Sequence, residues 1–118
     1  MEKVEKKSNS LKIKTEEITA LVSKTSKNCY GVVAIANKDD INLVEKISTI
    51  IKKGKKEEGV FVTKYSDNTF SVSVYLVLAQ DIKITEALRE CQKSIRFTLN
   101  KKYPGQCKAV NVYANELR

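Results

Sequence analysis

The sequence contains no histidine or tryptophan and only one proline. Without histidine, the chain lacks the commonest general base of enzymes. Its three cysteines, Cys29, Cys91 and Cys107, are far apart and form no CxxC pair, so their spacing argues against a zinc site. Neither a GxGxxG nor a GxxxxGK[ST] loop occurs. We therefore expect no enzymatic activity, no catalytic residues, no cofactor or metal site, and no small-molecule substrate.

Long apolar runs are also missing. No stretch approaches the roughly 18 apolar residues that a membrane span needs. The first ten residues are charged and lack the apolar segment of a signal peptide. These features predict a cytoplasmic protein with a flexible basic tail over residues 1–10 and a single domain over residues 11–118. Any association with a membrane would be peripheral or through a membrane protein.

Hydrophobic periodicity predicts an α+β domain in the order β-α-β-α-β-β-α-β. We expect a mixed sheet with the helices packed mainly on one face. Thr15 and Thr85 are the expected N-caps of the first and last helices, and Asp39 or Asp40 that of the second. The predicted strands cover 11–14, 31–37, 60–66, 69–79 and 108–117, and the predicted helices cover 16–28, 41–51 and 85–102.

The stretch "TFSVSVYLVLAQ" (69–80) has an apolar residue at every second position, from Phe70 to Leu78. This alternation predicts a strand with one face in the core. The preceding strand can pair with it in two ways. A three-residue loop pairs Val62 with Val74, whereas a two-residue loop pairs Val62 with Ser73. We favour the first pairing because it places apolar residues opposite one another.

The other face of this hairpin changes from polar to apolar along the strand. The residues predicted to share it form a candidate interaction surface: Phe61, Tyr65, Tyr75, Val77 and Tyr113. Coverage of this face by the N-terminal segment is the alternative. Aromatic residues on an open sheet face suit protein assembly.

The net charge of +8 also permits RNA or other nucleic-acid binding, or contact with an anionic membrane. However, no GxxG loop of a KH domain occurs, and "VFVTKYS" matches the aromatic RRM motif poorly. We favour a lysine-rich solvated surface without a ligand as the explanation of this charge.

Four segments, "GVVAIAN", "GVFV", "FSVSVYLVLAQDIKITEALRECQKSIRFTL" and "AVNVYANEL", follow one another in an order and spacing that resemble the bacterial alkaline shock protein family. The resemblance covers residues 11–118. It implies a non-enzymatic cytoplasmic interaction or scaffold protein linked to cell-envelope homeostasis or stress response. It further implies a protein partner or self-association, with membrane proximity provided by a membrane protein. A regulatory partner of a kinase-like protein in fatty-acid metabolism is an alternative implied by the shorter family members.

Overall fold

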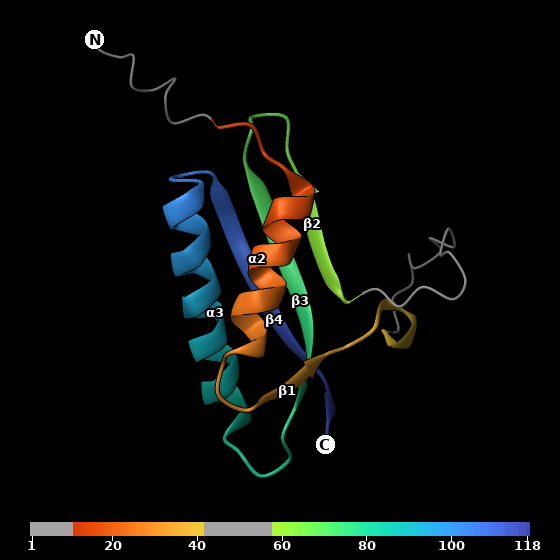
Figure 1. Ribbon diagram of the computed structural model, residues 1–118. Coiled ribbons are helices and arrows are strands. Elements are labelled where there is room, and N and C mark those ends of the chain that lie inside the picture. Colours follow the sequence, from red (N-terminus) through yellow and green to blue (C-terminus); the bar gives the residue numbers. More distant parts are fainter. Residues whose placement is uncertain (1–10, 42–57) are drawn as a thin grey trace.

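The computed structural model describes residues 11–41 and 58–118, in which two helices lie side by side over one face of a four-stranded sheet (Figure 1). This arrangement confirms the α+β class, the mixed sheet and the placement of the helices. The elements in chain order are α2 (Thr15–Lys27), β1 (Val32–Ile35), the short 3-10 helix η1 (Lys38–Asp40), β2 (Val60–Lys64), β3 (Phe70–Leu78), α3 (Ile84–Lys102) and β4 (Cys107–Leu117).

Strand β3 is the centre of the sheet. On one side it pairs antiparallel with β2 through residues 70–74 and with β1 through residues 76–78. On the other side it pairs parallel with β4 along its whole length. Between β1 and β2, the Tyr75 carbonyl accepts a hydrogen bond from the Ala36 N–H (2.9 Å), and the Tyr75 N–H donates to the Gly59 carbonyl (3.0 Å). The chain therefore leaves the sheet and rejoins it at the same residue of β3.

The core lies between the helices and the sheet. The alternating apolar residues of β3, from Phe70 to Leu78, are fully buried, as the sequence predicts. They belong to one cluster with Ile18 and Val22 of α2 and with apolar residues of α3, among them Ile95. Complete burial of each such side chain contributes about 1.5–3 kcal/mol, so the core supplies most of the force that holds the helices on the sheet.

The hairpin register differs from the prediction by two residues. Val62 pairs with Val72 rather than Val74, and Val60 pairs with Val74. The Tyr65 N–H donates to the Thr69 carbonyl, which leaves a three-residue loop over 66–68. Asn68 takes a left-handed conformation (φ 65°), which asparagine tolerates better than most residues and which closes the loop at this point. A slip of two residues keeps every side chain on its predicted face.

Both predicted threonine caps are wrong. The helix α2 starts at Thr15 itself, after Lys14, and α3 starts one residue before Thr85, after Lys83; neither N-cap residue makes a side-chain capping bond. The first turns instead contain Glu16, Glu17 and Glu86, whose charges favour the positive end of a helix dipole. Acidic residues at these positions replace the missing caps.

The predicted strand at 11–14 is also wrong, because these residues pair with no strand. The side chain of Gln106 takes the place of a neighbouring strand: its Oε1 accepts from the Leu11 N–H (3.1 Å), and its Nε2 donates to the Leu11 carbonyl (2.9 Å). Ile13 is buried in the core cluster. The alternation at 11–14 thus reflects the burial of Ile13 rather than a strand.

Two further predictions lie outside the described residues, namely the tail at 1–10 and the second helix at 41–51, apart from Ile41. Asp39 and Asp40, expected to cap that helix, lie within η1, whose N-cap is Asn37 without a side-chain bond.

Candidate functional site: the open face of the sheet

The face of the sheet turned away from the helices is called the open face here. It consists of the residues that alternate with the core positions of β2, β3 and β4. Near the hairpin it is polar, with Thr63, Ser71 and Ser73. Near the junction of β1 and β2 it is aromatic. The sequence prediction of a face that turns from polar to apolar is therefore confirmed for the described residues.

Three rings contact one another across the sheet, one each from β2, β3 and β4. Phe61 of β2 meets Tyr75 of β3 edge-on, with ring centroids 5.7 Å apart and an interplanar angle of 89°. Tyr75 stacks on Tyr113 of β4 at 4.8 Å and 23°. Pairing of Tyr75 with Tyr113 in the parallel ladder brings these two rings together. We name Phe61, Tyr75 and Tyr113 the aromatic row; Tyr113 is 43% exposed.

Val77 follows the aromatic row on β3, but it is not accessible. Only 2% of its surface is exposed, because it forms a small cluster with Ala36 and Ile41. A Cβ atom at Gly59 would collide with the Ile41 side chain, so glycine makes room for this cover. Val77 therefore lies on the predicted face, but the prediction that it is available to contact a partner is wrong. Among the described residues, the cover comes from the segment after β1 rather than from the N-terminal segment.

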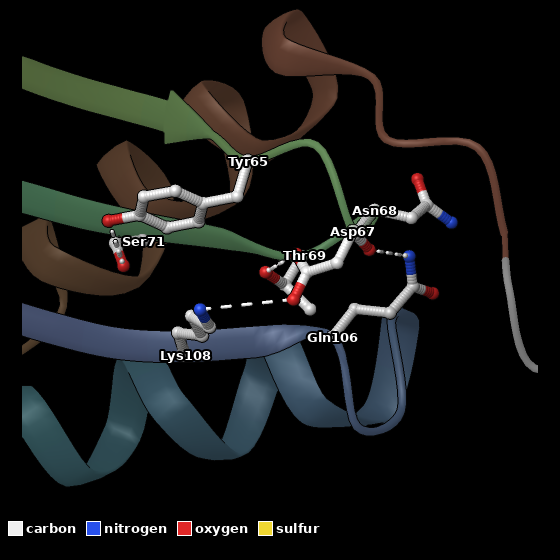
Figure 2. Close-up of polar contacts among 7 residues, drawn as sticks. All are labelled: Tyr65, Asp67, Asn68, Thr69, Ser71, Gln106 and Lys108. Atoms are coloured by element: carbon white, nitrogen blue, oxygen red, sulfur yellow. Dashed lines mark hydrogen bonds and ion pairs between the residues drawn. The ribbon is translucent and has the colours of Figure 1, made fainter.

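Tyr65 lies on the same face but apart from the aromatic row. Its hydroxyl donates to Ser71 Oγ (3.1 Å), and its side chain is 41% exposed. Lys108 Nζ lies 4.7 Å from the Tyr65 ring centroid and 3.9 Å from an oxygen of Asp67 (Figure 2). The structure therefore brings together three of the five predicted surface residues and places Tyr65 in a separate polar corner.

Two lysines lie at the open face that the sequence prediction did not include. Lys38 Nζ lies 5.0 Å from the Phe61 ring centroid, and Lys108 contacts Tyr65. Lys108 falls in an irregularity of the β3–β4 ladder, where the pairing passes from Cys107 to Ala109. Simple alternation along the strand cannot place such a residue. A cation over an exposed ring contributes about 0.5–1 kcal/mol and adds positive charge beside the aromatic side chains.

Asp67 at this face and two cysteine thiols in or against the core have a pKa shifted in the direction that weakens a base or a nucleophile. The hydrogen bond from Thr69, together with the charge of Lys108, lowers the pKa of Asp67, which makes its carboxylate a weak base. Burial raises the pKa of Cys91 to about 12, and burial also raises the pKa of Cys107. These two thiols are thus poor nucleophiles.

Neither a metal cluster nor a membrane span is found within residues 11–41 and 58–118. Those ranges contain no group of three or more His, Cys, Asp or Glu residues placed to hold a metal ion. They also contain no helix long and apolar enough to cross a membrane.

Comparison with known families gives one match over nearly the whole chain. The alkaline shock protein 23 family, described as having a cell envelope-related function, matches residues 3–118. The chain belongs to this family. The resemblance noted in the sequence is thereby confirmed.

Two relatives in this family come from bacteria. The uncharacterized protein Spy1614 of Streptococcus pyogenes serotype M6 is 27% identical over 116 residues, which cover 98% of this chain and 93% of that protein. The uncharacterized protein YloU of Bacillus subtilis (strain 168) is 24% identical over 106 residues, which cover 90% of this chain and 86% of that protein.

Solved structures with a similar fold include several forms of the MamM CTD. Its copper form in one variant has a TM-score of 0.53 and 10% identity, over 89% of this chain and 99% of that chain. Its nickel form in another variant has a TM-score of 0.52 and 10% identity, over 87% of this chain and 98% of that chain. At this identity the likeness describes the fold alone.

Proposed function

We propose that this alkaline shock family member is a non-enzymatic protein of the cytoplasm that serves cell-envelope homeostasis or stress response as an interaction protein. Its protein partner docks on the aromatic row. The observation that carries the proposal is the contact among three rings, Phe61, Tyr75 and Tyr113, on the sheet face opposite the helices. The family's cell envelope-related function gives this surface its context.

The chemistry of the row suits a protein partner. Aromatic side chains are enriched at the centres of protein interfaces because they bury a large area and lose little rotamer freedom. Edge-on and stacked contacts hold the rings of Phe61 and Tyr75 in place before any partner arrives. Side chains that are already held in place lose little conformational entropy on binding.

The test is affinity purification from native extract with three baits: the wild-type protein, Tyr113→Ser and Tyr30→Ser. Tyr30 is the matched control, because it is 75% exposed but lines a groove between α2 and α3 on the helical side. We expect one protein to be retained at high salt by the wild type and by Tyr30→Ser, and to be lost with Tyr113→Ser. Equal recovery by all three baits, or recovery by none, contradicts the proposal.

Nucleic-acid binding is the second candidate function, favoured by the cations beside the open face. Lys38 and Lys108 flank aromatic rings there, and the chain carries a formal charge of +8. Bases of a single strand can stack on such rings while lysines neutralise phosphates. The arrangement is compatible with weak, sequence-tolerant binding.

Salt dependence separates the two candidates. Single-stranded RNA bound by the open face would lose affinity steeply as salt rises, because each neutralised phosphate releases counterions. Fluorescence anisotropy with a labelled oligonucleotide should then show weaker binding for Tyr113→Ala than for Tyr30→Ala. Absence of binding at low salt removes this candidate.

A further inference from the structure

The outer edge of β4 is the longest continuous edge of the described sheet. The strand has 11 residues and pairs with β3 alone. The opposite edge is divided between β1, with four residues, and β2, with five. Natural sheets usually protect long edges with proline, charge or short strands. The middle of β4, from Ala109 to Asn115, contains neither proline nor a charged residue.

The backbone of this middle segment points outward at alternate residues. The Val110 carbonyl accepts a hydrogen bond from Gln92 Nε2 of α3 (2.7 Å), so it faces away from β3. Backbone groups two residues apart in a strand point the same way, so those of Val112 and Ala114 also face outward. Val112 and Ala114 therefore each offer a backbone donor and acceptor at the edge, and Val110 offers its N–H, because its carbonyl already accepts from Gln92.

We propose that this edge pairs with β4 of a second copy of the chain, antiparallel, about a two-fold axis at Val112. In this register Val112 lies opposite its own counterpart, and Val110 lies opposite Ala114 of the second copy. Outward-facing groups then meet outward-facing groups, as an antiparallel ladder requires. A slip of one residue would place them against groups already turned toward β3.

Charge favours the same register. Lys108 and Glu116 lie four residues before and four residues after Val112. The two-fold axis therefore places each Lys108 opposite Glu116 of the other copy, at both ends of the uncharged middle. Opposite charges in this position stabilise a pair of strands, whereas parallel pairing in register would place like charges together.

The contacts that Lys108 and Glu116 make within one copy compete only weakly with the charge pairs between two copies. Lys108 lies 3.9 Å from Asp67, and Glu116 binds the neighbouring Arg118 (2.9 Å). All these side chains are well exposed, and exposed ion pairs contribute little. The irregularities of the β3–β4 ladder fall at Lys108 and at Asn115, so regular pairing is expected from Ala109 to Ala114.

Pairing by this axis joins the two open faces on one side of a continuous sheet. Tyr113 of each copy comes to lie opposite Asn111 of the other, so the two aromatic rows face the same way. The self-pairing requires no other partner and therefore stands independently of the function proposed above.

Sedimentation velocity across a wide range of protein concentration tests the pairing. We expect the wild type to shift from the 13.3 kDa monomer toward twice that mass as concentration rises. Lys108→Glu and Glu116→Lys should each shift the dissociation constant several-fold toward monomer. The double variant Lys108→Glu/Glu116→Lys should restore wild-type behaviour, because the opposite charges again face each other. Lys64→Glu makes the same change of charge on β2 and should leave the dimer intact.

A backbone variant provides a second measurement. Ala114→Pro removes an outward N–H from the exposed edge and leaves the bonds to β3 in place. Its circular dichroism spectrum should match that of the wild type while its dimer is lost.

A wild-type chain that stays monomeric overturns the inference, as does a dimer that survives both single charge reversals or a double variant that fails to recover. Tyr113→Ser should keep the dimer while losing the partner of the open face, so failure of one proposal is distinguishable from failure of the other.

Discussion

Leu76 lies in the second half of β3 with none of its surface exposed. We expect Leu76→Ala to lower the free energy of unfolding by about 2–5 kcal/mol, because the substitution removes buried methyl groups and leaves a cavity. Ser73→Ala is the control: it lies on the same strand but faces away from the helices, and we expect a change within about 0.5 kcal/mol. Chemical denaturation followed by circular dichroism measures both. Equal losses would mean that the core does not lie on the face identified here.

Tyr103 anchors the start of α2 to the end of α3. Its ring is buried edge-on against Phe70, and its hydroxyl donates to a carboxylate oxygen of Glu17 (2.5 Å). That hydrogen bond, followed by the contact with Lys102 (3.1 Å), lowers the pKa of Glu17 in the folded protein. Ionised Glu17 is thus part of the link between the two helices.

This link predicts a dependence of stability on pH. A carboxyl group whose pKa is lowered by folding contributes stability above its unfolded pKa, and the contribution is lost as pH falls through the folded pKa. We expect the melting temperature of the wild type to fall on acidification below the ordinary glutamate range, near 4.5. In Tyr103→Phe, the melting temperature at neutral pH should be lower and the acid-induced fall smaller. Parallel curves for the two proteins would contradict this role of Glu17.

At the scale of the elements, the β2–β3 turn depends on the backbone of Asn68. Its φ of 65° costs most residues about 1–2 kcal/mol and glycine almost nothing. Asn68→Ala and Asn68→Gly both lose the side-chain bond to the Leu11 carbonyl (3.2 Å). The alanine variant should nevertheless be less stable than the glycine variant by roughly 1 kcal/mol in thermal or chemical denaturation, because only alanine has strain at this φ. Equal stabilities would show that the turn relaxes without cost.

The sequence contains enough information to predict the two described helices, the hairpin and the core face. The even positions of β3 and the apolar stripe with Cys91, Ile95 and Leu99 on α3 carry strong periodic signals. The register of the hairpin was harder to predict, because pairings two residues apart are equally apolar. Asn68 decides between them through its backbone conformation. Capping residues were misplaced because Glu16 and Glu17 favour the same helix start without a threonine bond.

The candidate site was predicted only where strands are regular. Phe61, Tyr75 and Tyr113 gather as expected from alternation across neighbouring strands. Burial of Val77 depends on Ile41, whose apolar periodicity predicts a helix but does not predict contact with this face of the sheet. Lys108 reaches the open face at a ladder irregularity, which no alternation rule locates.

For the whole molecule, the arrangement predicts an uneven distribution of local stability. Strand β3 has paired neighbours on both sides and a buried core face, whereas β1 is four residues long and lies at an edge. Hydrogen exchange followed by mass spectrometry should show the slowest exchange in peptides from β3 and much faster exchange in β1. Comparable rates in the two strands would mean that the sheet opens as a single unit.

Tyr75 gives the molecule one further property. Its N–H and carbonyl bind Gly59 and Ala36, and an additional antiparallel bridge joins Asn37 to Glu58. The two ends of the intervening chain are therefore held next to each other whatever lies between them. We therefore expect insertions, deletions and exchanged segments placed after Ile41 to leave the strands on either side unaltered. A protein engineer can use the same point to graft a foreign peptide onto the scaffold.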